Sequence, residues 1–355
     1  MGGVTGGLVC AHHHLYSALA RGMPAPPKSP TDFLSVLQQV WWRLDAALDN
    51  EIIYWSAALG AAEAVMAGTT TIIDHHESPM SIEGSLDAIA DGCALVGVRV
   101  IPSYGVTDRW SDKGRLVEVA RSDKMSVGAR RGLEECERFI GSGRPGMVGI
   151  HASFTCGDET LDAAADLAHR LGVGVHVHVA EGPDDSDAPA RLGKLARDNW
   201  LLVHCVGLRE FLPGTIVHNP RSNMNNSVGY ANPSRFSNRI ALGTDGIGAD
   251  MTEEFRLAYV AGRNHHIDFS PDTAWNWLSN GSALAPESCN DSVVWNYDHI
   301  DSPWHLAFTT GTHPVEVTID GETVIANSRP VTFDLEEIRR KAAEQSRRLH
   351  ERLAA

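Results

Sequence analysis

The sequence predicts an α/β fold, a closed (β/α)₈ TIM-like barrel, on three observations. Short β-branched segments alternate with longer helical patterns through most of the chain, which is typical of βα units around a parallel sheet. Eight such strands fit between residues 7 and 245. Histidine or aspartate ends strand after strand, and a barrel gathers these C-terminal strand ends at one site, whereas an open sheet spreads them along an edge.

Each element follows from local composition. The segment TTTIID at 69–74 has the β-branched content of a buried strand, and Gly68 before it is a good stop for the preceding helix. The eight strands are expected at 7–12, 69–74, 98–103, 147–151, 173–178, 201–204, 215–218 and 240–245. Apolar residues at helical spacing predict helices at 32–48, 51–67, 82–96, 129–140, 158–171, 252–263 and 272–282.

The chain after the barrel predicts a hairpin and a final helix. The segments VEVTI and TVIA flank Asp320-Gly321, a strong two-residue turn signal, so residues 315–326 are expected to form the hairpin. Residues 286–292 are rich in proline, asparagine and serine, and residues 334–353 have the pattern of a charged amphipathic helix. We therefore expect a barrel at 1–285, a small second unit at 286–333 and a C-terminal helix at 334–355.

Composition excludes several classes of protein. The 355 residues are 43% hydrophobic and 21% charged, a globular balance. The 30 basic and 45 acidic residues give a net charge of −15, which argues against a nucleic-acid partner. The six cysteines contain no C-x-x-C pair, which is typical of reduced thiols in a cytoplasmic protein. No signal peptide and no apolar run of ~18 residues is present, so no membrane association is expected.

The first chemical signal is His12-His13-His14 at the end of the first strand. Alternation along a strand sends His12 and His14 to the same face and His13 to the other. Two neutral imidazoles on one face make half of a tetrahedral zinc or iron site. A surface histidine run is the alternative, but the flanking segments GLVCA and LYSALA are apolar.

Three further strand ends carry the same chemistry. The segment HVHVAE holds two imidazoles, at 176 and 178, and Glu181 just past the strand as a proton carrier. Taken alone, a buried histidine with structural partners is the commoner outcome. His204 ends the LLVH strand, and Asp245 ends a buried strand in ALGTDG. Together, the four features favour a metal site.

These motifs carry a resemblance to a known family. GLVCAHHHLYSALARGMP, HVHVAE, LLVHCVGL, HNPRSNMNN and LGTDGIGADM resemble the amidohydrolase superfamily, in particular its mononuclear-metal aminohydrolase and chlorohydrolase branch. That branch includes guanine, 8-oxoguanine, cytosine and S-adenosylhomocysteine deaminases and triazine hydrolases. GMPAPPKSP, the Trp41–Trp42 pair and DHHESP are most similar to aminohydrolases associated with selenium metabolism. The resemblance covers most of residues 5–285.

The resemblance implies a ligand set and two catalytic groups. It places one divalent ion, zinc or else iron, on His12, His14, His178 and Asp245. It makes Glu181 the proton shuttle and His204 the group that polarises the substrate or orients the hydroxide, with Asp245 also accepting a proton. Binuclear relatives need a lysine on the fourth strand, and residues 147–157 contain none, so a single ion is expected.

Substrate contacts are less sharply indicated. Each candidate has a structural alternative, such as a surface ion pair or a packed barrel histidine. Trp41 and Trp42 are expected in the core or at an interface rather than as a stacking platform. The candidate substrate contacts are Arg21, His75, His76, His151, Arg221 and Asn223.

The chain departs from the family pattern in three places. Only about six residues precede the first strand, where relatives have half of a small β-sandwich. Residues 205–214 barely suffice for a crossover with a helix, and the segment after Ala285 lacks the usual sandwich motif. We therefore expect a partly missing β-sandwich, with 286–333 as its remnant. Two explanations of these departures are a shortened variant and a sequence written without its disordered segments. We favour the second, and an intact-protein mass of 38.4 kDa would refute it.

The expected activity is hydrolysis of a C–N bond in a nitrogen heterocycle. A metal-activated hydroxide would attack an amidine-like carbon and release ammonia, with Glu181 moving protons. One rival is another leaving group in the same site, a halide or the amide nitrogen of a cyclic ureide. The other is a catalytically silent metal-binding protein, although such a protein needs neither Glu181 nor His204. The expected partners are a small heterocycle and, from the resemblance, a second copy in a homodimer.

Overall fold

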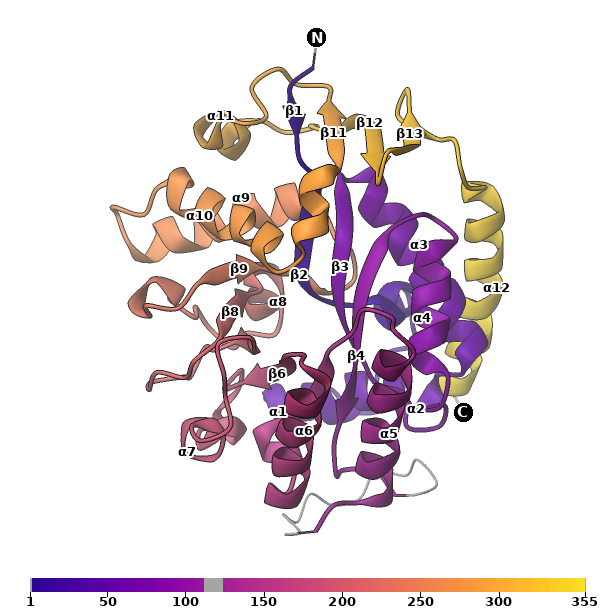
Figure 1. Cartoon of the computed structure of the whole chain (residues 1–355), viewed down its shortest axis with the longest axis vertical. Helices are drawn as coiled ribbons and strands as arrows, with labels where there is room; N and C mark the ends of the chain where they lie inside the picture. Colours follow the sequence, from indigo (N-terminus) through magenta and orange to yellow (C-terminus); the bar gives the residue numbers. More distant parts are fainter. Residues whose placement is uncertain (1, 112–123, 355) are drawn as a thin grey trace.

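The structure is a computed structural model that describes residues 2–111 and 124–354. Its centre is a nine-stranded parallel sheet in the order β10-β2-β3-β4-β5-β6-β7-β8-β9 (Figure 1). The strands are β2 (Leu8–His14), β3 (Thr69–His76), β4 (Arg99–Val106), β5 (Val148–Ala152), β6 (Val175–Val179), β7 (Leu201–His204), β8 (Thr215–His218), β9 (Ile240–Leu242) and β10 (Asp245–Gly246). Each predicted strand is present with its ends moved by a few residues.

The first and last strands of this sheet meet, because β9 and β10 are consecutive pieces of one segment. β9 pairs with β8, and β10 pairs with β2. Between them, the amide of Gly243 donates to the carbonyl of His218 and the amide of Thr244 donates to the carbonyl of His12, both at 3.0 Å. The predicted (β/α)₈ barrel is therefore confirmed.

Helices cover the barrel, with α4 and α5 packed on β4 and α6 packed on β5. Two connections differ from expectation. The helix predicted at 32–48 contains a π-helical turn, Leu37–Trp41, and residues 205–214 cross from β7 to β8 without a helix. The helices are α1 (Phe33–Val36), α2 (Trp42–Ala47), α3 (Asn50–Met66), α4 (Ser85–Ala94), α5 (Val127–Gly141), α6 (Asp158–Leu171), α7 (Ala188–Leu192), α8 (Pro220–Asn225), α9 (Met251–His265), α10 (Pro271–Ser279), α11 (Pro303–Phe308) and α12 (Leu335–Ala354).

A five-stranded antiparallel sheet caps the N-terminal end of the barrel strands (Figure 1). Its strands are β1 (Val4–Thr5), β11 (Ser292–Trp295), β12 (Pro314–Ile319), β13 (Glu322–Ala326) and β14 (Arg329–Pro330). The predicted hairpin is β12–β13, and its turn residues Asp320 and Gly321 both have positive φ, 50° and 83°. The expectation missed β1 and β11: the residues before the first barrel strand pair with β11, so both parts of the chain contribute to the small sheet.

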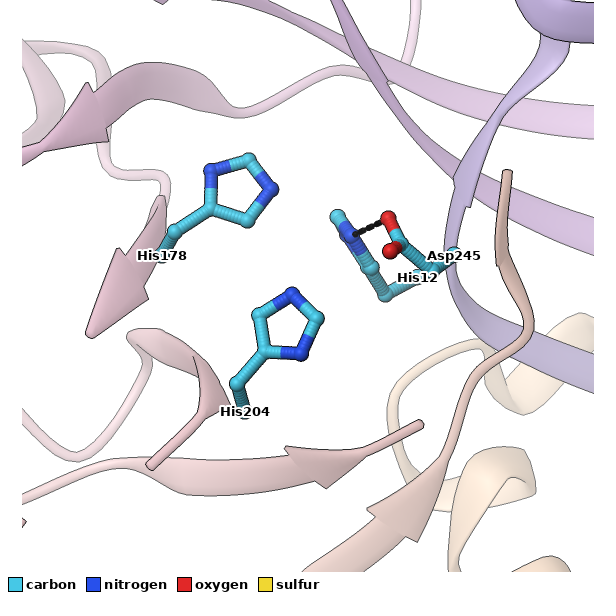
Figure 2. Close-up of side chains that lie close together, drawn as sticks. All are labelled: His12, His178, His204 and Asp245. Carbon is cyan, nitrogen blue, oxygen red and sulfur yellow. Dashed lines mark hydrogen bonds and ion pairs between the residues drawn. The ribbon is translucent and has the colours of Figure 1, made fainter. Parts of the chain in front are cut away.

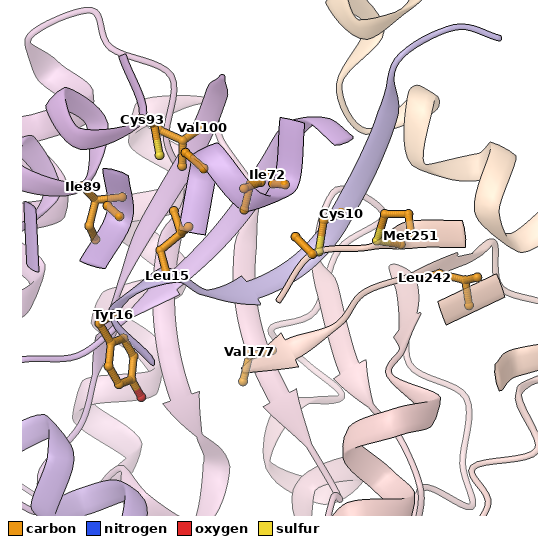
Figure 3. Close-up of a cluster of buried hydrophobic side chains, with 14 of the residues drawn as sticks. Cys10, Leu15, Tyr16, Ile72, Ile89, Cys93, Val100, Val177, Leu242 and Met251 are labelled. Carbon is orange, nitrogen blue, oxygen red and sulfur yellow. The ribbon is translucent and has the colours of Figure 1, made fainter. Parts of the chain in front are cut away.

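The buried side chains form two clusters. The larger lies between the strands and the surrounding helices, and Figure 3 shows Ile89 and Cys93 of α4 beside Val100 of β4 in it. The smaller contains Ala11 and Val203 and fills the barrel interior below the strand ends. α12 packs on α3. Within the described parts of the chain, no helix has both the length and the apolar content to cross a membrane.

Arg99, at the start of β4, ties the barrel to the small sheet. Its guanidinium contacts the buried carboxylate of Asp291 at 2.5 Å and the carboxylate of Asp320 at 2.7 Å. Arg99→Met is expected to lower the free energy of unfolding by about 3 kcal/mol, because Asp291 is left buried without its cation. Urea denaturation followed by circular dichroism measures the change. Arg340→Met, which removes an exposed pair with Glu337, is the control and should change it little.

Candidate metal centre and pocket

Five polar side chains converge at the C-terminal face of the barrel. Nε2 of His12 lies 3.1 Å from Oδ1 of Asp245, and Nε2 of His14 lies 3.0 Å from the same oxygen. Nε2 of His178 lies 3.3 Å from Nε2 of His14. In Figure 2 the rings of His178 and His204 face His12 and Asp245 across a small central space. Donor atoms of His12, His178, His204 and Asp245 all lie within 4.8 Å of one another.

A bulge in β2 aims its histidines at this centre. Between the pairs Cys10–Ile72 and His13–Asp74, β2 has one residue more than β3. Ala11 packs in the barrel interior, and the bulge allows the next residue, His12, to face the centre as well. Bulges often re-aim side chains beside functional sites in this way.

Hydrogen bonds from the other ring nitrogens fix which nitrogen faces the centre. Nδ1 of His14 donates to the carbonyl of His75 at 2.5 Å, and Nδ1 of His178 donates to the carbonyl of His151 at 2.6 Å. A neutral imidazole carries one proton, so Nε2 of His178 is left with a free lone pair, and Nε2 of His14 has one once that ring is neutral. This is the arrangement that metal-binding histidines show in proteins.

The tautomer of His12 follows from a longer chain of hydrogen bonds. The Ser103 hydroxyl donates to the carbonyl of Asp74, so its oxygen accepts from Nδ1 of His176, at 3.3 Å. Nε2 of His176 is then unprotonated and accepts from Nδ1 of His12, at 2.8 Å. His12 therefore also presents an unprotonated Nε2. His176 fixes this tautomer through its hydrogen bond with Nδ1 of His12.

The donor set fits a divalent cation. Burial lowers the pKa of His12 and His178 well below the usual range, so both rings are neutral. Burial alone would raise the pKa of Asp245, but the neighbouring His12 and His14 side chains hold it well below the usual range, so Asp245 is a carboxylate. Without an ion, a proton on Nε2 of His14 lies between this nitrogen and its neighbours, because Asp245 raises the pKa of His14 to about 9 despite burial. A divalent cation would take the place of that proton. Ligands about 2.0–2.1 Å from a tetrahedral zinc ion lie roughly 3.4 Å apart, close to the spacings observed.

Backbone strain concentrates at the same strand ends. Ala180, His204 and Asp245 have φ of 46°, 67° and 62°, in the left-handed region that side chains with a Cβ seldom adopt. Such residues cost roughly 1–3 kcal/mol each and persist where surrounding structure fixes them, commonly at functional sites. The turn at Ala180 immediately precedes Glu181.

Glu181 lies beside the centre and opposite His204. One carboxylate oxygen is 3.4 Å from Nε2 of His204, and the other accepts from the amide of Asn226 at 3.3 Å. Nδ1 of His204 donates to the side-chain oxygen of Asn223 at 2.8 Å, which directs Nε2 towards Glu181. Burial raises the pKa of Glu181 to about 7, against the lowering effect of His204. This carboxyl group can therefore both hold and release a proton near neutral pH.

A pocket of about 800 Å³, partly continuous with solvent, opens above the centre. Among the residues described here, His14, His178, Glu181 and Asp245 line its floor, while His12 and His204 lie fully buried beneath it. Its walls include several aromatic side chains. Trp41 lines the pocket, whereas Trp42, at 2% exposed, belongs to the core as expected and also borders the pocket. The aromatic wall residues are Tyr16, Phe33, Trp41, Trp42 and Phe154.

The predicted substrate contacts separate into two groups. His75 and His151 line the pocket, although Nε2 of His151 accepts from Arg109 at 2.8 Å and its Nδ1 donates to Thr155. Four others do not line it. Arg21 pairs with Glu63 on the surface, Arg221 pairs with Glu254, His76 donates to or accepts from Ser78, and Asn223 supports His204.

The family is decided by comparison with known proteins. The model of the amidohydrolase family matches residues 4–285. The chain belongs to the amidohydrolase family. A 5'-deoxyadenosine deaminase from Methanopyrus kandleri is 28% identical over 97% of this chain and 86% of its own length. A 5-methylthioadenosine/S-adenosylhomocysteine deaminase from Syntrophomonas wolfei is 26% identical over the same shares.

Solved structures show the same fold. This amidohydrolase superposes on a zinc-bound adenosine deaminase from Xanthomonas campestris with a TM-score of 0.82 and 20% identity, covering 99% of this chain and 86% of the other. It superposes on a zinc-complexed atrazine chlorohydrolase from Arthrobacter aurescens with a TM-score of 0.80 and 20% identity, covering 97% and 88%.

The sequence-based interpretation missed several residues around the amidohydrolase pocket, among them Tyr16, Asp45, Glu77 and Arg109. Glu77 directly follows β3 and Arg109 follows β4, so the strand-end rule that found the histidines could also have found them. Asp45 lies on α2, where only the three-dimensional structure reveals its place.

His176 is expected to tune metal affinity without touching the ion. His176→Phe removes the acceptor for Nδ1 of His12, so metal affinity should fall roughly 10- to 100-fold. His176→Gln keeps an acceptor and should lose less. Competition with a chromogenic chelator measures both values. Equal affinities for the unaltered chain and His176→Phe would contradict the role.

Proposed function

We propose that this amidohydrolase removes the amino group of a 6-aminopurine nucleoside, using one zinc ion held by His12, His14, His178 and Asp245. The observation that carries the proposal is the set of histidine Nε2 atoms gathered at the Asp245 carboxylate on the floor of the pocket. Both relatives quoted above are named as deaminases of adenosine derivatives.

The proposed roles follow from the positions of the side chains. A bound divalent ion would supply an acidified water at neutral pH. Glu181, with its pKa near 7, would deliver a proton first to a ring nitrogen and then to the leaving amine. His204, opposite Glu181, would polarise the substrate or orient the attacking water. Asp245 would accept a proton. The aromatic walls would bind the purine.

A single ion and zinc are both part of the proposal. β5 carries His151 as its last residue but one and lacks the lysine that bridges two ions in binuclear relatives. Zinc is present in both solved structures of the same fold, while three imidazoles and a carboxylate also suit iron. Metal analysis of protein purified without added metal distinguishes one ion from two and zinc from iron.

Ammonia release tests the activity. The metal-loaded protein is assayed with adenosine, 5'-deoxyadenosine, 5'-methylthioadenosine and S-adenosylhomocysteine, beside guanine, 8-oxoguanine and cytosine. Turnover of the adenosine series supports the proposal, and turnover confined to another base overturns its substrate. Chloride release from atrazine would favour the chlorohydrolase alternative that the Arthrobacter structure suggests. Silence from protein that holds one ion would favour a metal-binding role.

The proposal also includes a homodimer and a cytoplasmic location. Light scattering coupled to size-exclusion chromatography measures the mass of the particle in solution and so tests the homodimer. A mass near that of one chain would exclude the dimer.

A further inference from the structure

A buried group of charges borders the pocket beside the metal centre. Asp45 of α2 and Glu77 both line the pocket, and both are about 2% exposed. Arg109 lies behind them: its guanidinium contacts the Glu77 carboxylate, lies 3.4 Å from the Asp45 carboxylate and covers the ring of Trp42 at 4.4 Å. Its remaining amino group donates to His151.

This group carries one negative charge more than it can match. Two carboxylates face one guanidinium, and a charge buried without a partner is costly. Burial and the charge of Glu77 raise the pKa of Asp45 well above its usual range, so in the free pocket a proton on this carboxylate offsets the excess charge until a cation binds.

One oxygen of the group lacks a hydrogen bond. Arg109 reaches Oδ2 of Asp45, but no described residue makes a hydrogen bond of normal geometry to Oδ1. The Tyr16 hydroxyl interacts with this carboxylate and does not neutralise it, because burial raises the pKa of Tyr16 well above the usual range. A buried acceptor without a donor in a pocket wall is a place where a ligand donor gains binding free energy.

We propose that Asp45 and Glu77 form a subsite for a cationic ammonium group that the substrate carries in addition to its purine amino group. An ammonium both donates to Oδ1 of Asp45 and cancels the unmatched charge, whereas a neutral hydroxyl does only the first. The aromatic ring of Tyr16 beside Asp45 suits a cation as well, while the Trp42 ring is already covered by Arg109. This proposal rests on the proposed deaminase function.

The test compares two isosteric nucleosides, adenosine and 5'-amino-5'-deoxyadenosine, which differ by a hydroxyl against an ammonium. The ratio of their kcat/KM values is measured by ammonia release for the unaltered chain and for Asp45→Asn. We expect a ratio of about 10 or more in favour of the amino compound, falling towards 1 in Asp45→Asn. Glu77→Gln should also lower the ratio. Agreement between the two variants would show that the change does not come from misfolding of one of them.

The outcomes separate the two proposals. A ratio near 1 in the unaltered chain, or one that Asp45→Asn leaves unchanged, overturns the subsite and means that the carboxylates share a proton and serve packing alone. If neither nucleoside is deaminated, the proposed function fails. The subsite is then decided by calorimetric binding of 5'-amino-5'-deoxyadenosine: weaker binding to Asp45→Asn than to the unaltered chain supports it, and equal binding overturns it.

Discussion

Glu181→Gln is expected to lower kcat roughly 100- to 10,000-fold while metal content stays at the level of the unaltered chain. Glutamine keeps the shape of the side chain and its contact with Asn226, so the pocket is preserved. Glutamine cannot take up or release a proton. Glu181 is suited to that role because it lies opposite His204 and has a pKa of about 7. Steady-state ammonia release and metal analysis of the same preparation give both quantities.

Glu210→Gln provides a matched control on an exposed carboxylate outside the pocket, and it should leave kcat unchanged. Loss of metal together with activity in Glu181→Gln would place Glu181 among the ligands. Undiminished turnover would remove it from proton transfer altogether.

The sequence predicted the barrel because its strands are short, β-branched and ended by polar residues. In a segment such as 69–74 the periodicity and the side-chain type agree, and the structure places a strand there. The convergence of His12, His178, His204 and Asp245 was likewise expected, because strand order in a closed barrel fixes where each C-terminal end lies.

Features that depend on non-local packing could not be predicted. The strand β11 directly follows a segment rich in turn-forming residues, and β1 and β12 pair with it on either side. The π-helical turn at Leu37–Trp41 brings Trp41 to the pocket, although its pattern is that of an ordinary core helix. The tautomer of His12 depends on Ser103, which is far away in sequence and adjacent only in the folded barrel.

The choice between His14 and His204 as the fourth ligand is the last point that experiment can decide sharply. Both rings lie near Asp245 and His178, but Nε2 of His14 is 3.0 Å from the Asp245 oxygen, whereas Nε2 of His204 faces Glu181. We therefore expect His14→Ala to lose metal affinity by more than the roughly 10- to 100-fold that an outer partner costs, together with nearly all activity. His204→Asn should keep the ion and lose turnover.

Metal stoichiometry after dialysis against a weak chelator separates the two variants, and thermal unfolding supplies a second readout. A bound ion stabilises only the folded chain. When the free metal ion is at 100 times its dissociation constant, the free energy of unfolding rises by about 2.7 kcal/mol. His204→Asn should retain this metal-dependent rise in Tm, and His14→Ala should lose it. The reverse result, with the ion lost from His204→Asn and kept by His14→Ala, would assign the ligand to β7 and leave His14 as a wall of the pocket.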